Sequence, residues 1–408
     1  MRRVVITGVG LNSPLGNSYD ELYKNLKDEK SGVEYIPEWE EIKDLGTKVA
    51  GLVKNIDLKA LPRKYRRSMG RVAQLSAVAT SQAIQDSNLD EEVLHSKRCG
   101  LAFGSTMGGN ETMFEYVPEV KNNMSFRGQN SMAFLKMMSH TVAANIAQMF
   151  GIKGRNIPTC SACTSSAQGI GAGYESIKYG MSEVMICGGG EEHHYLSAGV
   201  FDVMGAASKK HTDKPELSSK PFDKDRDGLV VSEGSGAVVL EELEHALARG
   251  AKIYGEVIGY ATSCDGSHIT TPSIEGMKQV METSLEDANL NPEDIEYINA
   301  HATATQRGDI AESHATHSLF GSEVAVSSTK GHMGHLLGGC GVVESIICLI
   351  ALNKSFLPKT MNFKTLDSEC AKINVLAKNT NKDVNIVMSN NFAFGGINTS
   401  LIFKKYID

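Results

Sequence analysis

The segment around Cys163 has the residue types of a thiol nucleophile at the start of a helix. Residues 159–165 read Thr-Cys-Ser-Ala-Cys-Thr-Ser, and small and apolar residues then recur at helical spacing as far as Gly180. We therefore expect Cys163 in the first turn of a buried helix. The free N–H groups and the positive dipole end of that helix favour an anion, so the thiol is expected to tend toward the nucleophilic thiolate.

Two other interpretations of this segment remain open on the sequence. Cys160 and Cys163 form a Cys-x-x-Cys pair, which also suits thioredoxin-like redox chemistry or one half of a zinc site. The other six cysteines are scattered singly and offer no second pair for zinc. A lone cysteine in an apolar segment is most often a small buried hydrophobe. The nucleophile hypothesis therefore depends on catalytic partners elsewhere in the chain.

Two histidines and a lysine are each expected shortly after a strand. Apolar runs at residues 295–299 and 324–328 predict buried strands; His301 follows the first, and Lys330 and His335 follow the second. In open α/β sheets, ligands bind beyond the carboxyl ends of the strands. Because all three side chains follow such ends, we expect them to converge on the nucleophile.

A third strand, predicted at residues 384–388, precedes a loop from Phe392 to Asn398 that is expected at the same edge of the sheet.

His332 and His335 lie three residues apart, which could hint at a pair of metal ligands. No third ligand is obvious in the sequence. We therefore expect no metal, and we expect His332 to be exposed to solvent.

Composition narrows the class of protein. The 408 residues are 41% hydrophobic and 22% charged, which suits a globular chain of two or three domain-sized units or one large core built from two halves. A net charge of −7 disfavours nucleic-acid binding. Eight cysteines without a spacing framework indicate reduced thiols and a cytoplasmic setting. We expect no signal peptide and no membrane span, because no run of about 18 apolar residues stands out.

The predicted elements form two similar series of strands and helices. We expect halves at residues 1–245 and 246–408, the first with the nucleophile and the second with the histidines and the lysine. The first series has predicted strands at 3–7, 100–104 and 183–187 and helices at 20–28, up to residue 83, and at 132–150. The second series begins with a strand at 252–260 and includes an apolar, glycine-studded helix at 336–352.

Two motifs resemble ligand sites but lack parts that those sites need. Gly8-Val-Gly10 follows a strand, as in dinucleotide-binding turns, but the third glycine is at the wrong distance and Pro14 interrupts the turn. Asp223 to Gly228 resembles the start of an EF-hand loop, but position twelve is Gly234 instead of a chelating glutamate. We therefore expect neither a nucleotide nor calcium at these segments.

A basic cluster stands out in this acidic chain. Arg63, Lys64, Arg66 and Arg67 precede the long helix that ends near residue 83, and Arg127 is a further candidate member. The cluster is either a solvated helix start or a docking patch for an acidic partner that long-range charge attracts.

Together these segments resemble the β-ketoacyl-acyl carrier protein synthases, which are condensing enzymes of the thiolase superfamily. The resemblance spans essentially the whole chain. It rests on the motifs Ser-Ala-Cys163-Thr-Ser, His301-Ala-Thr-Ala-Thr, Ser-Thr-Lys330 with Gly-His335-Leu-Leu-Gly, and Asn-Phe-Ala-Phe394-Gly-Gly-Ile-Asn. Residues 201–206 and 241–251 look closest to the bacterial synthase I branch. Each motif is weak alone, but the set is specific.

The resemblance implies an α/β protein with the thiolase-like five-layered αβαβα fold, made of two similar halves with the active site between them. It implies a dimer, formed either with a second copy or with a ketosynthase-like chain-length partner. It implies no cofactor, because phosphopantetheine arrives on the acyl carrier protein. Cys163 would take an acyl group, and malonyl carrier protein would lose CO2 and attack it. The product would be a 3-oxoacyl carrier protein in fatty-acid or polyene-type elongation.

The same resemblance implies roles for single residues. His301 and His335 would donate hydrogen bonds to the enolate oxygen. Lys330 would set the electrostatics around His335, with Glu344 as a structural acid behind the site. The remaining roles are an oxyanion hole from the backbone N–H groups of Cys163 and Phe394, pantetheine binding by Thr303 and Thr305, an acyl pocket with Met107, Phe201 and Phe392, a gate at Phe394, and carrier docking by Arg63, Lys64, Arg66, Arg67 and Arg127.

Three departures from the family pattern bear on substrate choice. Residues 301–307 read His-Ala-Thr-Ala-Thr-Gln-Arg, where the family more often has His-Gly-Thr and a proline. Asn391 and Ala393 replace the commoner serine and glycine, and Gly331-His332 replaces a small or apolar pair. These changes hint at a specialised synthase, such as one that extends polyene or other secondary acyl chains.

Three further functions compete with this interpretation. A thiolase or CoA-dependent synthase would pair its cysteine and histidine with a second cysteine, which the arrangement of two histidines with Lys330 disfavours. A non-catalytic partner subunit usually lacks the nucleophile, whereas Cys163 is present. A redox protein would need Cys160 as much as Cys163, so replacement of Cys160 by serine separates this last function from the first.

Overall fold

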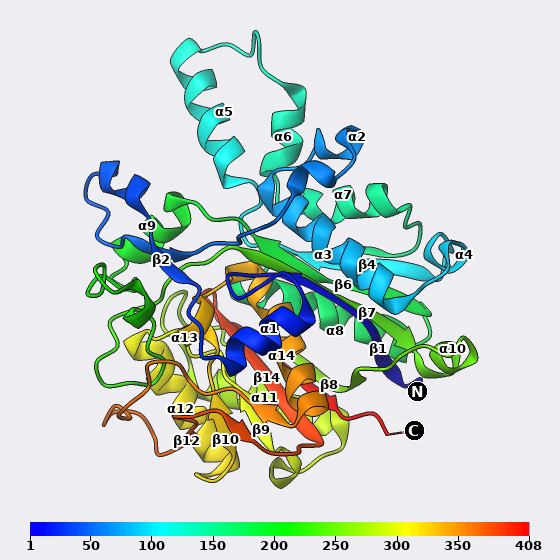
Figure 1. Ribbon diagram of the computed structural model, residues 1–408, viewed down its shortest axis with the longest axis vertical. Coiled ribbons are helices and arrows are strands. Elements are labelled where there is room, and N and C mark those ends of the chain that lie inside the picture. Colours follow the sequence, from blue (N-terminus) through cyan, green and yellow to red (C-terminus); the bar gives the residue numbers. More distant parts are fainter. Residues whose placement is uncertain (408) are drawn as a thin grey trace.

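The computed structural model describes residues 1–407 and builds them around a sheet of eleven strands (Figure 1). The order across the sheet is β12-β10-β9-β14-β15-β8-β1-β7-β6-β4-β5. These strands are β1 (Val4–Asn12), β4 (Cys99–Gly104), β5 (Asn156–Thr159), β6 (Val184–Glu191), β7 (Gly234–Glu242), β8 (Gly255–Cys264), β9 (Tyr297–Asn299), β10 (Ala325–Ser327), β12 (Asn374–Val375), β14 (Ile386–Ala393) and β15 (Ile397–Lys404). Two small ribbons pair β2 (Val33–Tyr35) with β3 (Val49–Gly51) and β11 (Phe356–Leu357) with β13 (Thr380–Asn381).

The sheet has two halves with one topology. In the N-terminal half, β4 pairs in parallel with β5 and β6, and β6 pairs antiparallel with β7. In the C-terminal half, β9 pairs in parallel with β10 and β14, and β14 pairs antiparallel with β15. The equivalent strands β1 and β8 join the halves through antiparallel pairing of residues 4–6 with 255–257. The described chain thus repeats one unit twice, as the sequence predicts; the boundary proposed after residue 245 falls within α10 (Leu243–Ala248).

Helices form three layers around the two halves. On the outer face of the N-terminal half, α3 (Arg71–Ser87) packs on β1 and β7. Between the halves, α8 (Ser165–Lys178) packs against α14 (Cys340–Lys354), and α14 contacts both β7 and β14. On the outer face of the C-terminal half, α11 (Ile274–Ala288) packs on β8 and β15, and α12 (Gln306–Phe320) packs on α11. The layers therefore alternate as αβαβα.

The remaining helices connect these layers or lie at the surface. They are α1 (Tyr19–Lys27), α2 (Arg63–Arg66), α4 (Glu91–Leu94), α5 (Asn110–Asn123), α6 (Ser131–Met137), α7 (Thr141–Phe150), α9 (Tyr195–Val203), α10 and α13 (Lys330–Met333). In Figure 1, α5 and α6 project beyond the rest of the molecule. The single helix predicted over residues 132–150 is two helices in the structure, α6 and α7, which a turn at residues 138–140 separates.

Helix α14 corrects the expectation that no segment is long and apolar enough for a membrane. Among the residues described here, the helical segment 337–354, which includes α14, is long and apolar enough to cross a membrane, judged by length and composition alone. Every residue from Cys340 to Leu352 is buried inside the protein, however. A helix that is apolar on all sides suits this position, because both halves of the sheet pack against it.

Three strands run further than the sequence predicts. β1 continues through Gly8 and Gly10, where a side chain would meet the backbone of α3: an added Cβ would lie 2.2 Å from the carbonyl oxygen of Ala83 and 2.1 Å from that of Ala79. These glycines therefore permit close helix–sheet packing and do not form a turn. β6 continues through residues 188–190, and β14 continues to Ala393, so the loop expected after residue 388 is a tight hairpin to β15.

Candidate active site

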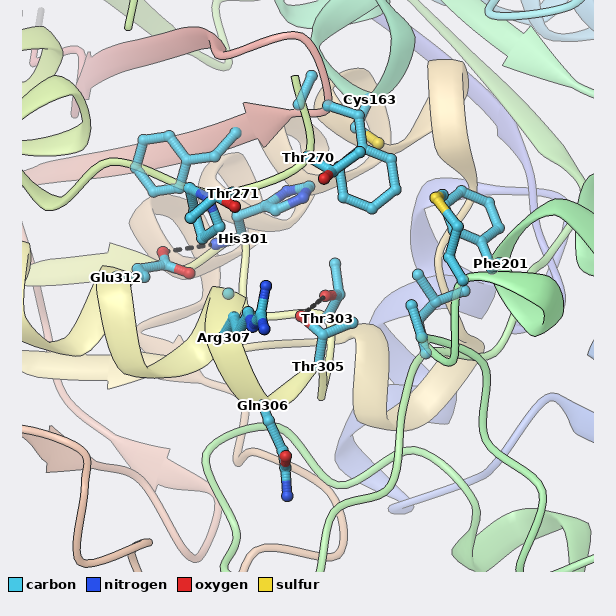
Figure 2. A pocket seen from close by; sticks show the side chains of 18 of the residues that line it. Cys163, Phe201, Thr270, Thr271, His301, Thr303, Thr305, Gln306, Arg307 and Glu312 are labelled. Atoms are coloured by element: carbon cyan, nitrogen blue, oxygen red, sulfur yellow. Dashed lines mark hydrogen bonds between the residues drawn. The ribbon is translucent and has the colours of Figure 1, made fainter. Parts of the chain in front are cut away.

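Cys163, His301 and His335 meet in the wall of a cavity of about 730 Å³ (Figure 2). Cys163 lies in the 3-10 turn Ala162–Thr164 that leads directly into α8, as the sequence predicts. His301 follows β9, and His335 follows α13. All three side chains are buried within the protein yet reach the cavity. The fold therefore brings together groups that are up to 172 residues apart in sequence.

The sulfur and the two imidazoles are within reach of one reacting group. The Sγ atom of Cys163 lies 3.0 Å from Nε2 of His335. The ring centroids of His301 and His335 are 5.2 Å apart, with the rings nearly perpendicular at 86°. The sulfur and one nitrogen of each histidine all lie within 4.8 Å of one another. A thioester carbonyl bound between them would contact a nucleophile on one side and two N–H donors on the other.

Backbone hydrogen bonds fix the position of both histidines. The carboxylate of Glu312, in α12, accepts the N–H groups of His301 at 2.8 Å and Ala302 at 2.6 Å. The N–H of His335 donates to the carbonyl of Val230 at 2.7 Å. The backbone at both histidines is therefore held by the surrounding chain.

Behind the histidines lies a buried polar network. Nζ of Lys330 forms an ion pair with the carboxylate of Glu344 in α14. Asn391, in β14, donates to the other oxygen of Glu344 at 2.7 Å and lies 3.5 Å from Nδ1 of His301. The side chains of Lys330 and Glu344 are 1% and 0% exposed. A buried charge pair of this kind imposes an electrostatic field that water does not screen.

Burial sets the protonation states of the three central groups. The pKa values of His301 and His335 lie well below the usual value, because burial and then the positive charge of Lys330 disfavour the imidazolium form. Both imidazoles are therefore neutral near pH 7. Burial raises the pKa of the Cys163 thiol to about 12, although Lys330 opposes the shift. This is opposite to the direction expected from the helix terminus alone.

Alkylation of Cys163 by iodoacetamide is expected to speed up continuously with pH. With a thiol pKa of about 12, the thiolate fraction, and hence the rate, rises about tenfold for each pH unit between 7 and 9. Mass spectrometry of the peptide that contains Cys163 measures the rate, in a Cys160→Ser background so that only one thiol in this peptide reacts. A plateau near neutral pH would instead indicate a thiolate–imidazolium pair with His335.

Most of the other predicted site residues line the same cavity. The hydroxyls of Thr303 and Thr305 lie 3.1 Å apart in its wall. The rings of Phe201 and Phe394 face each other across 5.7 Å, and the ring of Phe392 lies 6.1 Å from that of His301. The structure thus brings both predicted pantetheine residues and the three phenylalanines to one cavity.

His332 lies elsewhere than the sequence suggests, and Met107 has its contacts outside this cavity. Met107 is not among the residues that line the cavity, and its sulfur accepts a hydrogen bond from Ser197 at 3.6 Å. His332, expected at the surface, is fully buried, and its two ring nitrogens lie 3.0 Å from the backbone carbonyl of Lys30 and 3.2 Å from that of Lys359. Its side chain ties two loops together behind α13.

The basic cluster remains at the surface. Arg63, Lys64 and Arg67 are exposed on and beside α2, and Arg66 is half-buried there. Arg127 is exposed in the turn between α5 and α6. No ion pair with a carboxylate in residues 1–407 involves any of them.

Sequence reasoning missed two parts of the site. Glu312 lies 11 residues after His301, in α12 and among small residues, and burial raises its pKa to about 8 while the two N–H groups oppose the shift. An acid among the small residues that follow the His301 segment is the signal that could have found it. Asn391 was noted only as a departure from the family pattern. Its contact with Glu344 depends on β14 extending past residue 388.

Comparisons with known proteins agree with the geometry. The family profile described as "Beta-ketoacyl synthase, N-terminal domain" matches residues 1–246, and "Beta-ketoacyl synthase, C-terminal domain" matches residues 254–364. The chain is 38% identical over 408 residues to 3-oxoacyl-[acyl-carrier-protein] synthase 1 of Haemophilus influenzae, and the match covers all of both chains.

Solved structures give the same result. A beta-ketoacyl synthase from Burkholderia phymatum superposes with a TM-score of 0.97 at 40% identity, covering all of both chains. The ishigamide ketosynthase/chain length factor superposes with a TM-score of 0.93 at 29% identity, again over both whole chains. These neighbours confirm the predicted thiolase-like fold class. The chain belongs to the β-ketoacyl synthase family, and it is a condensing acyltransferase.

Proposed function

We propose that this chain joins an acyl group held on Cys163 to the malonyl group of a malonyl carrier protein, giving a 3-oxoacyl carrier protein and CO2. One observation carries the proposal: a buried thiol lies 3.0 Å from His335 and beside His301 at a cavity wall, with both imidazoles neutral. The end-to-end match to a 3-oxoacyl-[acyl-carrier-protein] synthase supports the substrate class.

The first half-reaction moves the acyl group to the enzyme. The sulfur of Cys163 attacks the thioester carbonyl of the acyl carrier protein, a new C–S bond forms, and the bond to the carrier's sulfur breaks. His335 takes the thiol proton through Nε2 and returns it to the departing carrier thiolate. The N–H groups of Cys163 and Phe394 hold the oxyanion that forms between these steps.

The second half-reaction forms the new carbon–carbon bond. The malonyl carboxylate leaves as CO2, and the electron pair moves to the thioester oxygen as an enolate. His301 and His335 donate N–H groups to that oxygen, which neutral imidazoles can do without gaining a proton. The enolate carbon attacks the acyl-Cys163 carbonyl, the C–S bond breaks, and the released thiolate takes up one proton from solvent. The ion pair of Lys330 and Glu344 sets the electrostatic potential around the histidines.

The cavity wall suits the rest of the substrate. Thr303 and Thr305 offer hydroxyls to the pantetheine arm, and Phe201, Phe392 and Phe394 offer an apolar surface to the acyl chain. No resident cofactor enters these steps, since phosphopantetheine arrives with the carrier protein. The acyl-pocket role of Met107 and the cytoplasmic setting stay predictions.

Incubation of the purified protein with acyl carrier protein thioesters, followed by malonyl carrier protein, tests this proposal. Intact-protein mass spectrometry should show a mass gain equal to the acyl group, which disappears when malonyl carrier protein is added and 3-oxoacyl carrier protein forms. A panel of saturated and polyene acyl groups separates fatty-acid elongation from a polyene pathway. A lack of any adduct and of any product would contradict the proposed reaction.

The variant His301→Ala is expected to separate the two half-reactions. Loss of one donor to the enolate oxygen should slow decarboxylation of malonyl carrier protein about 10²- to 10³-fold. Transfer of the acyl group to Cys163 should be slowed much less, because His335, and not His301, contacts the sulfur. Release of labelled CO2 measures the first rate and the acyl adduct measures the second. Equal losses in both rates would contradict this division of roles.

The carrier protein is proposed to dock on the basic cluster of α2. Carrier proteins of this kind are acidic, and Arg63, Lys64 and Arg67 are exposed with no carboxylate partner among the described residues. The double variant Arg63→Glu/Arg67→Glu should raise the KM for acyl carrier protein about tenfold at low salt, with a smaller effect at high salt. Lys378→Glu/Lys382→Glu, at two exposed lysines of the C-terminal half, is the charge-matched control. An unchanged KM in the double variant would place docking elsewhere.

A second subunit is proposed to cover the edge of the sheet at β5. This strand pairs on one side only, with β4, and alternates between exposed and half-buried residues. The nearby projecting arm α5–α6 exposes apolar side chains, among them Phe114, Val117, Phe126 and Phe134. An unpaired edge with exposed apolar groups is a typical surface for association. Light scattering on the purified chain distinguishes a dimer of identical copies from a subunit that needs a chain-length partner.

A further inference from the structure

The mouth of the catalytic cavity carries two basic side chains that the steps above do not use. Lys210 and Arg307 both line the cavity, and both are exposed to solvent. Neither forms an ion pair with a carboxylate within residues 1–407. Arg226 also lines the cavity, but it is fully buried, and its guanidinium pairs with Asp309 at 3.5 Å and Asp367 at 2.6 Å.

The acids of the same cavity are engaged by donors of the protein itself. The carboxylate of Asp227 accepts hydrogen bonds from the hydroxyl of Ser208 at 2.8 Å and from the backbone N–H groups of residues 209 and 210 at 2.8 and 3.0 Å. Asp265 accepts the side-chain amide of Asn398 at 2.6 Å. Glu312 holds the backbone at His301. The two cations at the mouth therefore remain available to an incoming anion.

The position of Arg307 matches one particular part of the substrate. Arg307 lies two residues after Thr305, at the start of α12, and Figure 2 shows it beside Thr303 and Thr305, with Cys163 at the other end of the group. A phosphopantetheine arm has a thioester at one end and a phosphodiester at the other. With the thioester at Cys163 and the arm along the threonines, the phosphodiester comes to the mouth of the cavity.

We propose that Arg307, assisted by Lys210, binds the phosphodiester of the phosphopantetheine arm and makes this chain prefer phosphorylated over unphosphorylated pantetheine thioesters. The proposal rests on the function proposed above and deepens it. A guanidinium matches two phosphate oxygens with two parallel N–H donors, and a lysine adds a point charge. Arg307 belongs to the Gln-Arg pair that departs from the family pattern, so the preference is a property of this chain's own sequence.

The test compares donors that carry the same acyl group. Octanoyl-pantetheine, octanoyl-4′-phosphopantetheine and octanoyl-CoA are each incubated with the protein, and the rate of adduct formation on Cys163 is followed by mass spectrometry. The KM for the two phosphorylated donors should be about tenfold lower than that for octanoyl-pantetheine at low ionic strength, and the ratio should shrink at high salt. Agreement between the two phosphorylated donors would assign the preference to the shared phosphate and not to the nucleotide.

Variants locate the effect. Arg307→Ala should reduce the KM ratio to within about twofold of unity, Arg307→Lys should keep part of it, and Lys210→Ala should give an intermediate ratio. Lys209→Ala removes the same charge one residue away, from a lysine that pairs with Asp202 at 2.6 Å outside the cavity wall, and should leave the ratio unchanged. Equal KM values in the unmodified protein, or an undiminished ratio in Arg307→Ala, would overturn the phosphate site while loading of Cys163 still supports the condensing function. No adduct from any donor, acyl carrier protein included, would overturn both.

Discussion

Replacement of Cys163 with alanine is expected to abolish the acyl adduct and to lower the rate of 3-oxoacyl product formation at least about 10³-fold. Alanine has no atom that can form the thioester with which condensation begins, and removal of a nucleophile commonly costs this much or more. The neighbouring histidines should stay in place, because their positions depend on the backbone contacts with Glu312 and Val230. Intact-protein mass spectrometry and product formation measure the two losses.

The matched control for this prediction is Cys160→Ser. Cys160 is exposed, and its sulfur lies 3.4 Å from the hydroxyl of Ser139 and 3.5 Å from the carbonyl of Thr106. Serine preserves a hydrogen-bonding group there, so product formation should stay near that of the unmodified protein. A redox function of the Cys-x-x-Cys pair predicts instead that both variants lose activity together. Full activity in Cys163→Ala would show that the nucleophile has been assigned wrongly.

Replacement of Lys330 with methionine is expected to lower the free energy of unfolding by about 3–5 kcal/mol. Methionine keeps most of the side-chain volume but leaves Glu344 buried without its counter-ion, so that Glu344 must either carry an unpaired charge or take up a proton in the folded state. The amide of Asn391 alone does not neutralise that charge. Urea unfolding near pH 7 measures the change. A loss below about 1 kcal/mol would show that the ion pair contributes little to folding.

Two further measurements distinguish an isolated charge from lost packing. In Lys330→Met, burial should raise the pKa of Glu344 further, so the folded state keeps a proton that the unfolded state loses above its ordinary pKa. Stability should then fall as pH rises from 6 to 8, and more steeply than in the unmodified protein. The double variant Lys330→Met/Glu344→Gln should regain most of the lost stability, because the amide carries no charge and still accepts the hydrogen bond from Asn391. A pH-independent loss that the double variant does not recover would indicate packing instead.

Hydrophobic pattern was enough to predict the general fold but not the ends of its elements. Apolar runs located the strands that later proved to be β4, β9 and β10, because buried strands with both faces covered are continuously apolar. The pattern failed where polar or glycine residues continue a strand. Ser389 to Asn391 read as loop residues, yet they pair with β15, and Asn391 contacts His301 and Glu344 in the site. Whether polar residues continue a strand depends on whether a neighbouring strand pairs with them, as β15 does here.

Spacing after strands was enough to predict which residues meet. Cys163, His301 and His335 do meet, although β5 runs antiparallel to β9 and β10 through the sheet, so the packing of the two halves against each other brings these residues together. The contacts that support these residues could not be predicted from spacing along the chain. Glu312 reaches the N–H of His301 from a separate helix, and Asn391 reaches Glu344 from another strand, and these contacts depend on the packing angle between elements.

By itself, the sequence determined the family and the two similar halves, and it predicted the nucleophile and its two histidines, because these depend on residue type and on order along the chain. The tertiary structure alone decided the chemical state of those groups. Burial raises the pKa of the Cys163 thiol to about 12 and keeps both imidazoles neutral, where the helix terminus alone had suggested a thiolate. It also placed His332 inside the protein and brought Lys210 to the same cavity mouth as Arg307. Solvent exclusion and contacts across the fold depend on atoms that are distant in sequence, so no local pattern reports them.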